Sequence, residues 1–351
     1  MIRKKRNRMK KIFTLVLCGM VVITASAQDI HFSQFYETAI LRNPALMGTY
    51  KGDYKVVAVY RSQWDAISKP FRTGMISGET RLPVKGQSGD YFTAGILTFF
   101  DRAGSIDLQT VGIYPSLSFS KYLSEESRTF ITAGFTGGFI QRSFDPSKMT
   151  TNLQYESGRH NPILPTGESF SNNRLTNWDL GAGIAVNSAA YEERLTYYAG
   201  ISSYHFSSPK VSFDQNNTFA RLDVKWNISG GGSYRLTDQY GIRAHLNYSR
   251  QGVYNEFILG GLLGWKRITN NEADPELSVY GGVFYRFNDA AIPTFKVDYK
   301  NLSITTSYDF TISSLRPANN GNGGFEISVM HSGLFNNEKY ERSRTICPKP
   351  W

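Results

Sequence analysis

Histidine, serine and cysteine are the first candidates for chemistry in this 351-residue chain. No two of the five histidines lie at a spacing that would hold a metal ion, and no nucleophile elbow of the G-x-S-x-G type is present. The sequence therefore predicts a protein that is not an enzyme and has no metal or cofactor. A Ser/His/Asp hydrolase built on a membrane barrel stays open as an alternative. The histidines are His31, His160, His205, His245 and His331.

Charged and amide side chains inside or beside apolar segments form a second group of candidates. An Arg or Lys that faces lipid at mid-depth costs about 2–4 kcal/mol, so in a membrane-spanning strand such residues must point inward. We interpret the group as a lumenal network of ion pairs and hydrogen bonds, in preference to a selectivity or gating role. Its members are Arg61, Gln63, Asp101, Arg286 and Asp309.

Apolar and polar residues alternate along the segments that must position these side chains. In residues 242–248, for example, Ile, Ala, Leu and Tyr alternate with Arg, His and Asn. Successive side chains of a β-strand point to opposite faces, so each segment has one apolar and one polar face. A soluble sandwich would also alternate. These segments, however, are about ten residues or longer, enough to cross a bilayer as tilted strands, and aromatic residues recur near their ends as interfacial girdles require.

The alternation predicts about fourteen strands, an even number as in bacterial barrels. We therefore expect an all-β fold, a transmembrane antiparallel up-and-down barrel over residues 53–335. If the chain starts from the periplasm, the long connections 143–173 and 207–220 face outside the cell. The predicted strands are 54–63, 72–82, 90–101, 106–122, 128–142, 174–187, 195–206, 221–235, 240–250, 253–267, 276–287, 292–298, 302–313 and 324–335.

Residues 1–27 have the pattern of a secretory signal peptide. A basic start, either at the first methionine or at Met9, precedes an apolar run and the small residues Ala25-Ser26-Ala27. The leader carries seven basic and no acidic residues, so cleavage before Gln28 lowers the net charge from +10 to +3. No basic stripe remains for nucleic acid. We predict an outer-membrane protein whose outer face contacts lipid.

Two segments flank the predicted barrel. In residues 28–52, Asn43 precedes Pro44, as when a helix cap is followed by a proline at the first helical position. We expect a short helix or plug in the periplasmic mouth, with helix capping as the first role of these two residues and gating as the second. The tail, 336–351, ends in Cys347-Pro348-Lys349-Pro350-Trp351. Two prolines exclude a central strand there, so we expect the tail in the periplasm.

Several short motifs, taken in order, resemble those of the PorP/SprF family of Bacteroidota over nearly the whole mature chain. The chain departs from that pattern at Phe325, where the family usually has His, and at its end, which has an extra Pro and Trp351 in place of Phe. The motifs are His31-Phe32-Ser33-Gln34-Phe35, Asn43-Pro44-Ala45, Tyr60-Arg61-Ser62-Gln63-Trp64, Asp101-Arg102-Ala103-Gly104, Tyr308-Asp309-Phe310-Thr311-Ile312-Ser313 and Cys347-Pro348.

The resemblance implies a non-enzymatic outer-membrane barrel of the type IX secretion and gliding system. Members of the family act with that machinery, and some are needed to export or hold a large adhesin on the cell surface. The implied partners are type IX secretion components and such an adhesin. The resemblance also makes the tail residues Cys347, Pro348, Lys349 and Trp351 candidates for contact with a periplasmic partner.

A plugged channel for a small solute, like a porin or a fatty-acid transporter, is the alternative function. Fourteen strands leave room for a pore unless the N-terminal segment and inward side chains fill the lumen. The width of the open lumen therefore separates the two hypotheses.

Overall fold

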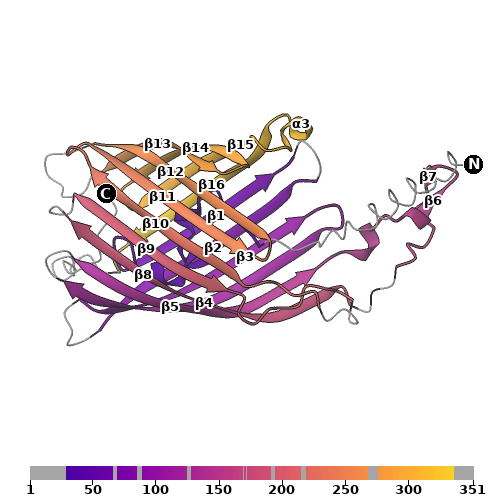
Figure 1. The fold of residues 1–351 in the computed structure, drawn as a ribbon, viewed down its shortest axis with the longest axis horizontal. Coiled ribbons are helices and arrows are strands. Elements are labelled where there is room, and N and C mark those ends of the chain that lie inside the picture. Colours follow the sequence, from indigo (N-terminus) through magenta and orange to yellow (C-terminus); the bar gives the residue numbers. More distant parts are fainter. Residues whose placement is uncertain are drawn as a thin grey trace, which may run out of the picture.

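Fourteen antiparallel strands close into a barrel in the computed structural model of the chain (Figure 1). Strand β1 pairs with β2 on one side and with the last strand, β16, on the other. The predicted transmembrane-type barrel and its strand number are confirmed. The structure describes residues 29–65, 69–84, 89–124, 128–168, 170, 172–190, 194–214, 219–267 and 276–335, so the predicted signal peptide and tail lie outside the described residues.

Wall strands follow one another in chain order around the barrel. They are β1 (Tyr54–Gln63), β2 (Phe71–Pro83), β3 (Tyr91–Ala103), β4 (Leu108–Ser124), β5 (Thr129–Ser143), β8 (Arg174–Ala190), β9 (Leu195–Tyr204), β10 (Lys225–Arg235), β11 (Tyr240–Gln251), β12 (Tyr254–Arg267), β13 (Leu277–Arg286), β14 (Ala290–Tyr299), β15 (Leu302–Thr311) and β16 (Asn322–Gly333).

The two ends of the barrel differ in their connections. We call the end where β1 begins the Tyr54 end and the opposite end the Gln63 end. The longest connections, 144–173 and 205–224, lie at the Gln63 end, together with helix α3 (Arg316–Asn319). Connection 144–173 carries η3 (Pro146–Lys148), η4 (Asn152–Gln154) and the hairpin of β6 (Tyr155–Glu156) and β7 (Arg159–His160), which stands away from the wall in Figure 1. That the Tyr54 end faces the periplasm stays a prediction.

The start of β10 is the main difference from the predicted strands. Alternation continues back to Arg221, yet the wall strand begins at Lys225. Arg221 instead forms a β-bridge with Lys210, and the Leu222 N–H donates to the Pro209 carbonyl (2.9 Å). These residues thus pair within the loop, because a local alternation does not specify which partner a strand finds.

The N-terminal segment, residues 29–50, runs through the lumen. Asp29 lies at the Gln63 end beside Lys225 (3.0 Å), whereas the Gly48 N–H donates to Glu79 toward the Tyr54 end (2.7 Å). Between them lie three short helical turns, η1 (Phe35–Glu37), α2 (Ala39–Arg42) and η2 (Pro44–Leu46). Among the described residues, no helix is long and apolar enough to cross a bilayer.

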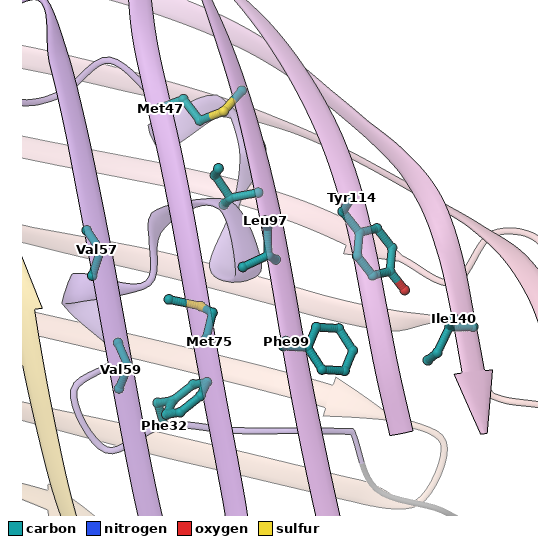
Figure 2. Close-up of a cluster of buried hydrophobic side chains, with 10 residues drawn as sticks. Phe32, Met47, Val57, Val59, Met75, Leu97, Phe99, Tyr114 and Ile140 are labelled. Atoms are coloured by element: carbon teal, nitrogen blue, oxygen red, sulfur yellow. The ribbon is translucent and has the colours of Figure 1, made fainter. Parts of the chain in front are cut away.

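This course is deeper than the position expected in one mouth of the barrel. The segment carries an apolar residue at intervals along its length, and each one packs on the inner wall. Burying those side chains stabilises the whole path of the segment rather than one end of it. Figure 2 shows Phe32 and Met47 of the segment against Val57, Val59, Met75, Leu97, Phe99, Tyr114 and Ile140 of β1 to β5.

Candidate functional site in the barrel lumen

A buried ion cluster joins the first and last strands of the barrel. Arg61 of β1 donates through Nη2 to Asp309 Oδ2 of β15 (2.8 Å) and through Nη1 to Glu326 Oε2 of β16 (3.0 Å). Arg286 of β13 donates to the same Asp309 oxygen (2.5 Å). All four side chains are at most 5% exposed, so the closing seam of the wall is held by charges that water does not reach.

Ser33 of the N-terminal segment lies at the centre of this cluster. Its hydroxyl donates to Asp309 (2.7 Å) and accepts from Arg61 (2.5 Å) and Arg286 (3.2 Å). The backbone N–H groups of Ser33 and Gln34 donate to the two carboxylate oxygens of Glu326, both at 2.8 Å. Every carboxylate oxygen of Asp309 and Glu326 therefore accepts a hydrogen bond, which is the condition under which buried charges are tolerated.

A second charged group holds the segment at the Gln63 end. Asp29 accepts from Lys225 (3.0 Å) and lies 3.4 Å from Nε2 of His205. Nδ1 of His205 lies 2.7 Å from Asp179, which also accepts from the Tyr114 hydroxyl (2.8 Å). The histidine thus bridges a carboxylate of the segment to a carboxylate of strand β8.

The charge states of this second group follow from its pairing. Burial alone would lower the pKa of His205, but its hydrogen bonds to Asp179 and Asp29 and their negative charges raise that pKa to about 9. Burial opposes ionisation of Asp29, but the charge of Lys225 and the hydrogen bond from His205 outweigh it and hold the Asp29 pKa well below its usual range. His205 is therefore a cation and Asp29 an anion at neutral pH.

Further along, the segment is held by one more ion pair and by aromatic rings. Lys296 of β14 donates to Glu37 (2.6 Å), and both side chains are at most 6% exposed. The Tyr36 ring stacks against His245 of β11 and Phe284 of β13, with both centroid separations 5.0 Å. Stacking of this kind adds to apolar burial and orients the ring.

Glycines of the wall let the middle of the segment approach very closely. A Cβ at Gly134 of β5 would overlap the backbone of Pro44 and Ala45, and one at Gly183 of β8 would overlap the Asn43 side chain. Asn43 caps η2 by accepting from the Ala45 N–H (2.9 Å), and its Nδ2 donates to backbone carbonyls of strands β8 and β9 (3.2 and 3.3 Å). The residue expected to cap the turn thus also fastens it to the wall.

The five lumenal residues singled out from the sequence separate into two places. Arg61, Arg286 and Asp309 meet in the ion cluster, and the Gln63 amide oxygen accepts from Arg61 Nε (3.2 Å) when it faces the guanidinium. Asp101 lies apart and accepts from the Thr73 hydroxyl of β2 (2.6 Å). Cys347, Pro348, Lys349 and Trp351 lie outside the described residues, and their role stays a prediction.

Ser33, Glu326, Asp29 and His205 make contacts in the lumen that the sequence did not predict. A signal was present for two of them. Ser33 is a polar residue beside Phe32, and Glu326 lies between Phe325 and Ile327 on the polar face of the last strand. No local sequence pattern, however, indicates that a residue near position 30 contacts one near position 320.

The arrangement holds a segment of the chain itself inside the barrel. In the described part of the chain, no group of His, Cys, Asp and Glu is placed to hold a metal ion. The hydroxyl of Ser33 makes hydrogen bonds to two guanidinium groups and a carboxylate. The site is a set of buried ion pairs, stacked rings and close backbone contacts that fix residues 29–50 inside the wall.

These features define a membrane β-barrel of the outer-membrane type with its own N-terminal segment inside it. The chain belongs to the PorP/SprF family of type IX secretion system membrane proteins, whose family model matches residues 24–330. The resemblance seen in the motifs is thereby confirmed. No curated protein sequence matches the chain.

Solved structures with a similar outline are also membrane barrels. A Pseudomonas aeruginosa FadL homologue has 12% identity and a TM-score of 0.48, with 84% of this chain and 94% of that chain covered. The Pseudomonas putida toluene transporter TodX has 10% identity and a TM-score of 0.46, covering 87% and 94%. CdiB from Escherichia coli has 10% identity and a TM-score of 0.41, covering 78% and 62%. At these values the chain is similar to them in general architecture only.

Proposed function

We propose that this barrel is a non-enzymatic outer-membrane component of the type IX secretion and gliding system that supports export and surface retention of a large adhesin-like cargo. Membership of the PorP/SprF family supports the link to secretion. The observation that carries the rest is the course of the N-terminal segment, which occupies the lumen from Asp29 at one end to Gly48 toward the other. A folded adhesin could not share that space, so the barrel acts as a holder or adaptor and not as the conduit.

Connections at the Gln63 end offer a surface for such a cargo. Phe144 is buried and packs against Phe170 and Phe213, with ring centroids 4.9 and 4.6 Å apart, so the two longest connections support each other. Beyond this contact, Leu153 and Ile163 are 67% and 89% exposed. Large apolar side chains that reach so far into solvent are typical of protein interaction sites when they gather on one surface.

The tail, residues 336–351, is the proposed contact to a periplasmic partner in the secretion machinery. Strand β16, which precedes the tail, ends at Gly333 at the Tyr54 end, the end that the sequence assigns to the periplasm. Its Cys347-Pro348 ending resembles that of the family, and this likeness is the ground for the proposal.

Co-purification from outer membranes tests the proposed function. We expect a tagged barrel to bring down a very large surface protein, and a strain that lacks the barrel to lose that protein from its surface. A variant that lacks residues 150–168 should assemble normally yet retain less cargo. Unchanged surface proteins in the deletion strain would overturn the proposal.

Truncation after Phe335 tests the tail separately. We expect the shortened barrel to assemble in the membrane but to export less cargo, with Ser343→Ala as the control that keeps the tail and its Cys347-Pro348 ending. A truncated barrel that exports and retains its cargo as the full chain does would exclude the tail contact while leaving the role of the loops intact.

The alternative function, a solute channel, requires an open lumen. A solute could pass only if the N-terminal segment left the lumen, which would separate the charges of the buried ion cluster. A purified barrel that shows a steady open conductance in a planar bilayer would favour the channel over the holder.

A further inference from the structure

Charged residues of the wall strands are segregated by face. Every Asp and Glu of the fourteen wall strands is buried or half-buried, at positions that point into the lumen. The exposed charges on these strands all point outward, all are basic, and all lie near a strand end, where a charge on the lipid face costs least. They are Arg72, Arg102, Lys121, Arg174, Arg250 and Arg267.

Two of these arginines stand directly opposite each other. Arg72 of β2 and Arg102 of β3 are register partners at the Gln63 end, and both are exposed on the outer face. Like charges directly opposite in an antiparallel pair destabilise it. Within the described residues neither guanidinium has an ion pair or hydrogen bond. Both guanidinium groups are therefore open to an anion outside the protein.

Hydrogen-bonding side chains extend this pair on both sides. Ser62 of β1 is the register partner of Arg72, and Gln109 of β4 is the register partner of Arg102. Four neighbouring strands thus place a hydroxyl, two guanidinium groups and an amide in one outward-facing row. Arg72, Arg102 and Gln109 can each donate a hydrogen bond to an anion. The Ser62 hydroxyl donates to the Asp65 carboxylate (3.3 Å).

The next outward row toward the middle of the wall is apolar. It consists of Tyr60, Gly74, Phe100 and Val111, again register partners across the same four strands. The Phe100 ring covers Gly74, since a Cβ there would overlap it. Tyr60, Phe100 and Val111 are 39%, 42% and 38% exposed. A polar row directly above an apolar one marks the level at which lipid headgroups meet acyl chains.

We propose that Arg72, Arg102 and Gln109 bind the phosphate of a membrane lipid whose acyl chain lies over Tyr60, Phe100 and Val111. The planar guanidinium fork matches the geometry of phosphate oxygens and can bind them bidentately. A phosphate between Arg72 and Arg102 would neutralise their repulsion. This lipid site lies on the outer wall and does not depend on what the barrel holds at its loops.

Native mass spectrometry of the purified barrel in dodecyl maltoside tests the site. The probes are lipid A that carries its phosphate groups and the same lipid A after enzymatic removal of the phosphates. We expect the wild-type chain to retain the phosphorylated lipid preferentially. Arg72→Gln together with Arg102→Gln should lower that preference by roughly thirtyfold, because each basic residue at a membrane surface contributes about a factor of five.

Matched variants keep the test interpretable. Arg250→Gln removes an outward arginine at the same end that faces Trp226 and not a second arginine, so it should leave the preference unchanged. Arg72→Lys with Arg102→Lys keeps the charge without the fork and should give an intermediate value. Heat-modifiable migration on gels shows that each variant is folded. Equal retention of both lipids by the wild type, or an unchanged preference in the Arg72/Arg102 glutamine variant, would overturn the site.

Discussion

The N-terminal segment is held differently in its two halves. In the charged half, residues 29–37, the contacts are ion pairs and charge-assisted hydrogen bonds from Asp29, Ser33 and Glu37. In the apolar half, residues 38–50, Leu46 and Met47 are fully buried among wall side chains and the backbone meets wall glycines. Both halves lie in the same lumen and pack apolar side chains on the wall, as Phe32 does in the first half. The first half adds buried ion pairs, whereas the second adds close contacts with wall glycines.

This difference indicates different roles for the two halves. Buried ion pairs bring little net stability, because the gain from pairing is offset by loss of hydration, but they fix one arrangement of partners. Apolar burial stabilises without such a cost, at about 25 cal/mol per Å² removed from water. We therefore expect the apolar half to anchor the segment and the charged half to fix its register against the closing seam of β1 and β16.

Removing the carboxylate at the centre of the ion cluster should have the largest effect. Asp309→Ala would leave Arg61 and Arg286 buried without their shared partner and should lower the free energy of unfolding by about 3–5 kcal/mol. Urea unfolding of the purified barrel measures the loss, and hydrogen exchange should rise first in residues 31–36. Thr306→Ala, on the outward face of the same strand, is the control. A loss below about 1 kcal/mol would show that the cluster does not hold the seam.

A side chain at position 134 should instead displace the apolar half of the N-terminal segment from the wall. Gly134→Val would force the backbone of Pro44 and Ala45 away from β5, and overpacking of this kind costs about 1–3 kcal/mol. Hydrogen exchange should then rise in residues 43–48 while residues 31–36 change less. Gly281→Val provides the comparison, since nothing lies within 4 Å of a Cβ there. Equal effects of the two variants would contradict the close contact.

Asn43 caps η2 and also fastens it to strands β8 and β9, and two substitutions separate these two roles. Asn43→Ala removes both the cap of η2 and the hydrogen bonds to β8 and β9, which should cost about 1–2 kcal/mol. Asn43→Asp keeps an oxygen for the Ala45 N–H but cannot donate to the two carbonyls. If the wall contacts matter, the aspartate variant should be nearly as unstable as the alanine variant. A fully stable aspartate variant would leave capping as the sole role of this residue.

Raising the pH should have the smallest effect and should act on the charged half alone. Because the His205 pKa rises from 6.5 to about 9 in the folded barrel, its contribution to stability is complete below about pH 6.5 and is lost as the pH passes 9. The contacts of Ser33 and Glu37 hold the segment further along, so only its first residues should loosen. Proteolytic access to residues 29–32 between pH 7 and 10 measures this. His205→Gln should remove the dependence, and a dependence that persists in that variant would assign it to another group.

The wall was predictable from the sequence because its signal is local. Alternation placed β1 at residues 54–63, the span observed, since every second side chain must be apolar to face lipid. The same signal failed at Arg221, which pairs with the loop residue Lys210 and not with a wall strand. The grouping of Arg61, Arg286 and Asp309 followed from the cost of charges in lipid, but that argument could not separate Asp101 from them or supply Ser33 as their partner. The depth of the N-terminal segment depends on which glycines it meets, and no local pattern encodes that.

Conductance of single barrels in a planar bilayer tests most directly whether the N-terminal segment closes the lumen. The wild-type chain should show no steady current, while Asp309→Ala, in which the charged half is no longer fixed, should show openings. A steady open channel in the wild-type barrel would contradict the account.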